Sequence, residues 1–177
     1  MKDSIKRISI IGGSGTGKTT LADNLGRVLN LPVYHIDGIN YLKDWEQRDK
    51  EERDKIILDK INENEWIMDG TYSSTLQQRI EKSNLVIFLD YSSFAHLKGV
   101  LGRYKKLKGQ ERLEIPGCKE RMSFNFLLWV INWRRNKRKK ILQFLNDIER
   151  DNTLIFKDRK KLNKWFENEF NTKIKTN

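Results

Sequence analysis

The sequence predicts an α/β fold in which a parallel five-stranded sheet is covered by helices on both faces. Short, nearly continuous apolar runs alternate with helical or polar stretches along the chain, as is typical of parallel strands buried on both faces. A glycine-rich loop at 12–19 separates the first run from a helical pattern. At 177 residues the chain is long enough to bury a full core but short of the length at which chains usually divide. We therefore expect one domain, residues 1–177.

The expected elements follow from these patterns in chain order. Strands are predicted at Arg7–Gly12, Pro32–Asp37, Trp66–Asp69, Leu85–Asp90 and Thr153–Lys157. Helices are predicted from the glycine-rich loop to Asn30, at 45–62, at Ser92–Leu107, at Arg121–Glu149 and at Arg159–Phe170. In the longest helix, the helical spacing predicts a core face of Phe124, Leu127, Leu128, Ile131, Leu145 and Ile148.

The glycine-rich loop fits the phosphate-binding template G-x-x-x-x-G-K-[ST]. Its glycines let successive backbone N–H groups point at an anion, and the following helix adds the positive end of its dipole. Lys18 is placed to reach the β- and γ-phosphates, and Thr19 to offer its hydroxyl to the Mg²⁺ ion that bridges them. The sequence therefore predicts ATP and Mg²⁺ as cofactors, with ATP bound by Gly12, Gly13, Ser14, Gly15, Thr16, Gly17, Lys18, Thr19 and Thr20.

Acidic residues end three of the predicted strands: Asp37, Asp69 and Asp90. Ligands of open parallel sheets gather at the carboxyl ends of the strands. We interpret Asp69 as the metal-side carboxylate and Asp37 as the acceptor-side carboxylate, which accepts either a proton or a hydrogen bond from an acceptor hydroxyl. For Asp90, a cap on the next helix near Ser92 is favoured over a catalytic role. His35 alternates with Asp37 along its strand, but a single strand histidine is more often a packing residue.

The positive charge lies in one segment of the chain. The formal net charge is +11, and residues 98–140 contain fourteen Lys or Arg and three Asp or Glu, which is also +11. Six cations fall within Arg134–Lys140, too many for one small ligand. This run is either a solvated face or a surface that tracks phosphates on a polyanion, so we expect weak, sequence-independent nucleic-acid binding through this helix.

Composition excludes several classes of protein. No apolar stretch approaches the length of about 20 residues that a membrane span requires. The first strand follows the N-terminal Met1 almost at once, which leaves no room for a cleavable signal segment, and we expect a cytoplasmic protein. Cys118 is the only cysteine, so an internal disulfide and a cysteine-rich zinc site are excluded. We interpret it as a packed thiol rather than a nucleophile.

Strings outside the loop carry a more specific signal. They are Tyr34-His35-Ile36-Asp37, Asp69-Gly70-Thr71-Tyr72, Arg79, Phe88-Leu89-Asp90 and Gly117-Cys118-Lys119-Glu120-Arg121. Together with the loop they resemble the bacterial proteins called DNA topology modulation proteins, small P-loop proteins related to adenylate kinase and other nucleoside or nucleotide kinases. The likeness runs from the first strand to about Phe156. It implies the P-loop NTPase fold in its nucleotide-kinase form, with strand order 2-3-1-4-5.

The resemblance also implies roles for residues outside the loop. A mobile basic lid is implied at about 103–121, where Arg103 and Arg121 are the expected catalytic pair that contacts the transferring phosphoryl group, with Arg112 between them. The acceptor-binding residues implied are His35, Asp37, Tyr72 and Arg79. The Gly-Phe-Pro-Arg turn of adenylate kinase is replaced by Gly70-Thr71-Tyr72-Ser73, so specificity for AMP does not carry over.

Two functions are compatible with these observations. The first is an ATP-dependent kinase that transfers the γ-phosphoryl group to a small nucleoside, nucleotide or similar metabolite. The second is a nucleotide-dependent nucleic-acid-binding or regulatory protein that uses the basic run at 134–140. Asp37 discriminates between them, because a pure binder has no need of a carboxylate on the acceptor side.

Overall fold

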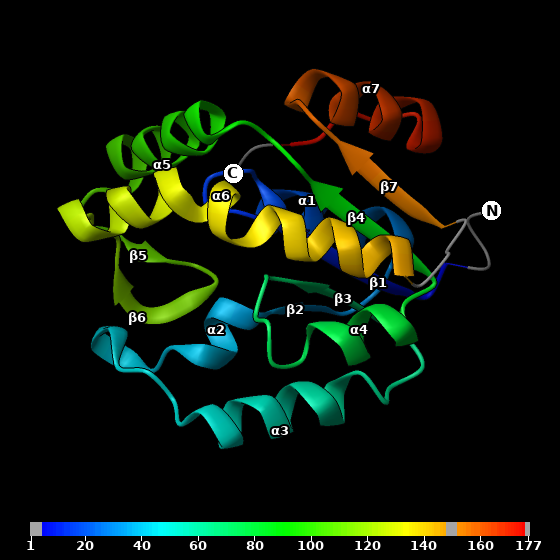
Figure 1. The fold of residues 1–177 in the computed structure, drawn as a ribbon, viewed down its shortest axis with the longest axis horizontal. Helices are drawn as coiled ribbons and strands as arrows, with labels where there is room; N and C mark the ends of the chain where they lie inside the picture. Colours follow the sequence, from blue (N-terminus) through cyan, green and yellow to red (C-terminus); the bar gives the residue numbers. More distant parts are fainter. Residues whose placement is uncertain (1–4, 148–151, 176–177) are drawn as a thin grey trace.

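Five parallel strands form the central sheet of the computed structural model, which describes residues 5–147 and 152–175. Their order is β2-β3-β1-β4-β7, and Figure 1 shows helices on both sides of them. The bounds are β1 Arg7–Gly12, β2 Val33–His35, β3 Trp66–Asp69, β4 Leu85–Leu89 and β7 Thr153–Phe156. Counted among the parallel strands alone, this is the predicted order 2-3-1-4-5. The predicted fold class is confirmed.

The remaining elements are helices and one hairpin. The helices are α1 Lys18–Leu29, α2 Ile36–Asn40, α3 Lys50–Lys60, α4 Leu76–Lys82, α5 Ser93–Leu107, α6 Phe124–Asp147 and α7 Arg159–Phe170, with a 3₁₀ turn η2 at Lys43–Trp45. The hairpin joins β5 Glu111–Arg112 and β6 Ile115–Lys119 and lies between α5 and α6, within the range predicted for a lid. No helix in the described ranges is long and apolar enough to cross a membrane.

Two apolar layers hold the helices against the sheet, because neighbouring residues of a strand point to opposite faces. On one face, Ile8, Ile10 and Ile87 pack with α1 and α7. On the other, Ile11 and Phe88 pack with α4 and α6. A third cluster joins α2 and α3 to the outer part of the sheet: Ile36, Ile57, Ile61, Trp66 and Met68.

The second strand is shorter than predicted. Strand Pro32–Asp37 was expected, but β2 ends at His35 and the chain turns directly into α2. Asp37 therefore lies in the first turn of a short helix, not at the end of a strand. The turn is stabilised by burial of Ile36, which is inaccessible to solvent. Helix α4 has no counterpart in the sequence prediction, since its seven residues are too few to show a clear apolar period.

The predicted core face of the longest helix is wrong at three positions. Phe124, Leu128 and Ile131 are exposed by 73%, 42% and 43% of their surface. Leu145 is buried as predicted, and Ile148 lies outside the described residues. The true core face contains Val130, Trp133 and Ile141. Periodicity locates an apolar stripe on a helix, but it does not tell whether a neighbour covers that stripe.

Candidate active site

The phosphate loop ends at the N-terminus of helix α1. It connects β1 to α1, and Gly17 caps the helix in the left-handed conformation, with φ 89°. No side chain caps the N-terminus of α1, and its first turn contains no acidic residue. A helix N-terminus without a side-chain cap favours binding of phosphate oxygens.

Helix α5 lies directly against the back of this loop. A Cβ atom on Gly99 of α5 would overlap the carbonyl oxygen of Gly15, and a Cβ atom on Gly15 would meet Val100 at 2.7 Å from its backbone nitrogen. Gly15 also has φ 78°, which favours glycine. The loop and α5 are therefore in backbone contact, and a substitution on α5 can displace the loop.

His96 of α5 lies beneath the loop as a buried, neutral histidine. Its side chain is inaccessible to solvent, it meets Trp133 of α6 edge to face with 5.4 Å between ring centres, and neither ring nitrogen has a hydrogen-bond partner in the structure. Burial, together with the nearby positive charges of Lys18 and Arg134, lowers the pKa of His96 to about 4. His96 therefore remains uncharged at neutral pH.

Lys18 folds back over the loop. Its Nζ donates to the carbonyl oxygen of Gly13 at 2.9 Å. Burial lowers the pKa of Lys18, although the carboxylates of Asp69 and Asp37 act in the opposite direction. Both carboxylates lie on the same cavity as the ammonium group. A poorly solvated ammonium group is stabilised when a charged phosphate oxygen replaces a neutral carbonyl oxygen as its hydrogen-bond partner.

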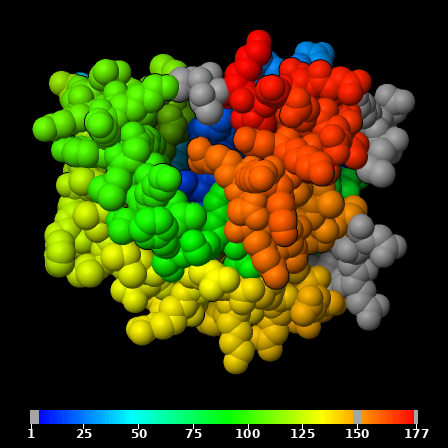
Figure 2. Space-filling view, turned by 90° about the horizontal axis from the view of Figure 1, so that it is seen from above, coloured from blue at the N-terminus to red at the C-terminus, as the bar shows by residue number. Residues whose placement is uncertain are grey.

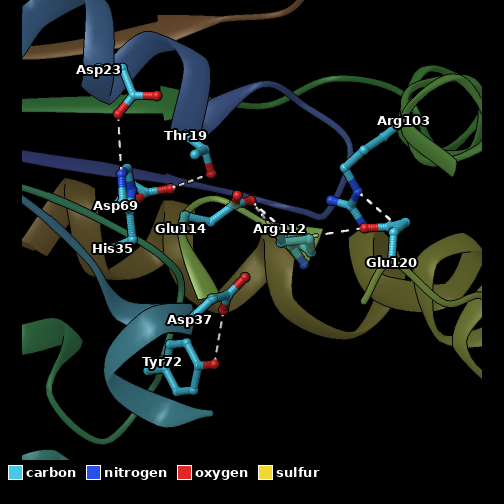
Figure 3. A network of polar contacts seen from close by, with 10 residues as sticks. All are labelled: Thr19, Asp23, His35, Asp37, Asp69, Tyr72, Arg103, Arg112, Glu114 and Glu120. Carbon is cyan, nitrogen blue, oxygen red and sulfur yellow. Dashed lines mark hydrogen bonds and ion pairs between the residues drawn. The ribbon is translucent and has the colours of Figure 1, made fainter. Parts of the chain in front are cut away.

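Thr19 and Asp69 form the candidate metal side. The Thr19 hydroxyl donates to Asp69 Oδ2 at 3.1 Å, and the other oxygen of Asp69 accepts from His35 Nδ1 at 2.6 Å. His35 Nε2 donates to Asp23 Oδ1 at 3.1 Å, so one imidazole bridges two carboxylates (Figure 3). Burial alone would lower the pKa of His35, but the hydrogen bonds to Asp23 and Asp69 outweigh it and raise the pKa to about 10. His35 is therefore a cation that holds Asp69 beside Thr19.

The residues of the metal side fit a magnesium ion. A hydroxyl and a carboxylate are hard oxygen ligands, and Mg²⁺ in nucleotide sites takes one or two protein ligands together with phosphates and water. Within residues 5–147 and 152–175, no group of three or more histidine, cysteine or acidic side chains could hold a metal ion by itself. Thr19 and Asp69 are thus suited to a metal that arrives with phosphate ligands.

Asp37 lies on the acceptor side and is bonded to Tyr72. The Tyr72 hydroxyl donates to Asp37 Oδ1 at 2.9 Å, and the other Asp37 oxygen points away from Tyr72 (Figure 3). Burial raises the pKa of Tyr72, and the Asp37 charge adds to this shift. Tyr72 therefore stays protonated and fixes the carboxylate. The Arg53 guanidinium lies 5.0 Å from the centre of the Tyr72 ring.

The prediction that Arg79 binds the acceptor needs correction. Arg79 is inaccessible to solvent and does not line the cavity. It donates to the carbonyl oxygens of Gly70 at 3.0 Å and Tyr72 at 3.3 Å. Burial lowers the pKa of Arg79 to about 10. Its place in the structure is beneath the 70–72 segment, which it holds in position.

The arginines of the predicted lid are paired with acids of the same segment. Arg103 Nε lies 3.2 Å from Glu120, and Arg112 donates to Glu114 through Nε at 3.0 Å. A second, longer ion pair joins Arg112 to Glu120 at 3.7 Å. Figure 3 shows these four side chains as one chain of charges opposite Asp37. The guanidinium groups are thus held at the cavity by carboxylates.

Trp45 of η2 fastens the hairpin to the acceptor side. Its ring nitrogen donates to the Lys119 carbonyl at 2.8 Å, and its backbone N–H donates to Cys118 Sγ at 3.2 Å. The guanidinium groups of Arg121 and Arg112 lie 5.1 Å and 5.7 Å from the centres of its rings. Cys118 is buried, in agreement with the packed thiol that we predicted. Sequence reasoning missed Trp45, because a tryptophan in a polar stretch gives no periodic signal.

Asp90 pairs with the basic run of α6 instead of capping α5. Ser92 is the N-cap, since its side chain accepts from the Ala95 N–H. Asp90 is buried and accepts from Arg138 Nε at 2.7 Å, and Arg134 Nε lies 3.5 Å away. The predicted cap is therefore wrong. The remaining cations of the basic run face two different surroundings. Lys137 lines the cavity, whereas Arg135, Lys139 and Lys140 are exposed to solvent.

One cavity of about 1720 Å³ joins the two sides. The predicted site residues on its lining are Gly12, Ser14, Gly15, Gly17, Lys18, Thr19, Thr20, His35, Asp37, Asp69, Tyr72, Arg103, Arg112 and Arg121. Gly13, Thr16 and Arg79 lie outside the lining, and Asp23 joins it without having been predicted. In Figure 2, atoms of the early chain (blue) lie at the bottom of a hollow between α5 and the β7–α7 segment. The cavity exceeds the usual size of a pocket for one small ligand.

Comparison with known proteins gives a family and a set of folds. Residues 7–168 match the model of a family described as AAA domain. No curated protein matches the sequence. A shikimate kinase from Aquifex aeolicus is 17% identical, with 94% of this chain and 99% of that one aligned and a TM-score of 0.52. A shikimate kinase from Bacteroides thetaiotaomicron is also 17% identical, with 93% of this chain and 99% of that one aligned and a TM-score of 0.52. A gluconokinase from Sinorhizobium meliloti is 15% identical, with 86% of this chain and 82% of that one aligned and a TM-score of 0.50. At these identities the likeness concerns the fold alone.

Proposed function

The chain belongs to the AAA domain family, and we propose that it is a kinase that transfers the γ-phosphoryl group of Mg-ATP to a hydroxyl of a small nucleoside, nucleotide or similar metabolite. The observation that carries this proposal is the shared cavity. The phosphate loop, the Thr19–Asp69 pair and Asp37 open onto the same space of about 1720 Å³. A protein that only binds a nucleotide needs the first two of these groups but not the third.

Each side chain has a distinct task in this reaction. The loop and Lys18 hold the phosphates, while Thr19 and Asp69 would hold a Mg²⁺ ion, which would neutralise phosphate charge. Asp37 orients the acceptor hydroxyl and accepts its proton, with Tyr72 fixing the carboxylate through the 2.9 Å hydrogen bond. Arg103, Arg112 and Arg121 neutralise charge on the transferring group. The glutamates that pair with Arg103 and Arg112 keep them in reach of the cavity before ATP arrives.

The fold of shikimate kinase and gluconokinase supports a hydroxyl acceptor. These neighbours are named as a shikimate kinase and a gluconokinase, and Asp37 provides the proton acceptor that a hydroxyl substrate needs. The motifs shared with DNA topology modulation proteins support the same P-loop kinase assignment. The regulatory alternative is weakened, because Arg134 and Arg138 are engaged with Asp90 and are not free for nucleic acid.

A direct assay tests the proposal. ADP release from Mg-ATP is measured with a panel of nucleosides, nucleotides, and cyclic and open-chain hydroxy acids, and phosphorylated products are identified by mass spectrometry. We expect one class of acceptor to raise ADP release well above the rate with water alone. Lys18→Ala is the matched loss variant and should weaken ATP binding by about 10- to 100-fold, the usual effect of removing a charged hydrogen bond. Failure of every acceptor, combined with unchanged ATP affinity in Lys18→Ala, would contradict the assignment.

A further inference from the structure

Five large apolar side chains are exposed on the outer surface of the α5–α6 pair. Their exposed fractions are 76% for Phe94, 42% for Leu101, 73% for Phe124, 42% for Leu128 and 43% for Ile131. None of the five lines the cavity of the candidate site. Contiguous exposed apolar patches on folded domains mark interaction surfaces.

Two polar contacts show that α5 and α6 lie side by side. Ser93 Oγ donates to the Ile131 carbonyl at 3.0 Å, and Arg103 is paired with Glu120 just before α6. The two helices are therefore antiparallel neighbours, with the start of α5 beside the middle of α6. Figures 1 and 2 show them side by side, α5 in green and α6 in yellow. Positions four and seven residues apart share a helix face. On each helix the exposed set lies opposite the ring that packs beside the phosphate loop, His96 on α5 and Trp133 on α6, so both sets point away from the loop. We call these five residues the apolar strip.

Cations stand at both ends of the apolar strip. On α6 the helical spacing that links Phe124 to Ile131 continues to Arg135 and Lys139, and both are exposed. On α5 the exposed Lys105 follows Leu101 by one turn, at the opposite end because the helices are antiparallel. Helix α5 contains no Asp or Glu, and α6 contains only Asp147. The surface is thus apolar at its centre and positive at its ends.

We propose that the apolar strip docks the protein on an anionic lipid surface. Phenylalanine and leucine side chains enter the boundary between headgroups and acyl chains, while flanking Lys and Arg pair with acidic headgroups. A second copy of the chain fits less well, since a two-fold interface through this surface would bring the cations of both copies together. Nucleic acid would engage the cations but leave the apolar side chains in water.

Docking would leave the candidate site free. His96 and Gly99, which contact the phosphate loop, lie on the other face of α5 from the strip. Substitutions in the strip therefore report on docking without removing a group from the cavity, and this inference does not depend on the kinase assignment.

Vesicle flotation at physiological salt tests the proposal. The full chain is mixed with phosphatidylcholine vesicles, alone or with about one-third phosphatidylserine, and we expect binding to the anionic vesicles only. The double variant Phe94→Ser/Phe124→Ser should bind at least about tenfold more weakly. Its matched control is Val28→Ser/Ile155→Ser, where side chains exposed by 40% and 43% lie outside the strip. Leu128→Gln provides a second strip variant should the double variant unfold on thermal melting.

A charge series separates lipid docking from simple attraction. Arg135→Gln/Lys139→Gln should weaken binding to anionic vesicles by about 30-fold, from about 1 kcal/mol for each cation. Its control is Lys160→Gln/Lys164→Gln on α7, which removes the same charge from exposed positions. The proposal is overturned if anionic vesicles are not bound, or if the charge variants lose binding while the strip variants keep it. A dimer in sedimentation velocity that Phe94→Ser/Phe124→Ser dissociates would assign the strip to a second copy instead.

Discussion

The nucleotide side of the cavity comes from one short stretch of chain, whereas the acceptor side is assembled from several distant segments. Eight consecutive residues, 12–19, from the last residue of β1 to the second residue of α1, supply the phosphate loop, and glycine contacts with α5 fix its backbone. The acceptor side combines Asp37 of α2, Trp45 of η2, Tyr72 after β3 and the arginines of the segment 103–121. The first side is held by backbone packing and the second by hydrogen bonds and ion pairs. We therefore expect the nucleotide side to respond most to substitutions that change the size of a side chain, and the acceptor side to those that change its charge.

The largest effect is expected at Asp37. Asp37→Asn removes the proton acceptor but keeps the shape of the side chain, so turnover should fall by roughly 10²–10⁴ while ATP affinity changes by only a few-fold. Steady-state kinetics and calorimetric titration with Mg-ATP measure the two quantities separately. Full activity in this variant, on an acceptor that the wild type phosphorylates, would make the carboxylate structural and remove the chemical distinction between the two sides.

His96 makes the nucleotide side sensitive to acid. Its pKa of about 4 in the folded protein lies below the ordinary value of 6.5, so the unfolded chain takes up the proton first as the pH falls. Stability should decline from pH 6.5 to pH 4 by up to about 3 kcal/mol and then level off. His96→Leu lacks this titration, and the difference in unfolding free energy between the two proteins isolates it from the carboxylates. A constant difference over that pH range would show that the histidine is solvated.

Two glycines of α5 provide a matched test of the backbone contact. A Cβ atom on Gly99 overlaps the phosphate loop, while one on Gly102 meets nothing within 4 Å. Gly99→Ala should cost about 1–3 kcal/mol of stability and weaken ATP binding, because the loop must move. Gly102→Ala should stabilise the helix by about 0.5–1 kcal/mol and leave ATP binding unchanged. Denaturant unfolding and calorimetry check both, and equal behaviour of the two variants would refute the close approach.

The smallest effect is expected at Trp45. Trp45→Leu removes the ring that Arg112 and Arg121 contact, and with it the hydrogen bond to Lys119. We expect the KM for the acceptor to rise about tenfold, with the Kd for ATP unchanged. A larger change in ATP binding than in acceptor KM would mean that the hairpin serves the nucleotide side.

Much of the nucleotide side could be predicted from the sequence, because its residues are neighbours in the chain. The spacing of Gly12, Gly17 and Lys18 carries the geometry of the loop, and the buried strands Leu85–Leu89 and Trp66–Asp69 show as apolar runs. The order of the parallel strands came from the family resemblance and is confirmed by the sheet. Assignments to single positions on the lining, such as Asp37 and Asp69, rested on where a strand ends.

The tertiary structure alone decided which partner each charged or apolar side chain meets. Asp90 lies in sequence beside the cap of α5, yet it pairs with Arg138, which is 48 residues away. The family resemblance placed Arg79 at the acceptor, but the packing of α4 on the sheet buries it under the 70–72 segment. Phe124 and Ile131 have the spacing of a core face, yet both are exposed in the folded chain. Local spacing determines secondary structure and contiguous loops, whereas partners across the chain depend on how the elements pack, which no local pattern records.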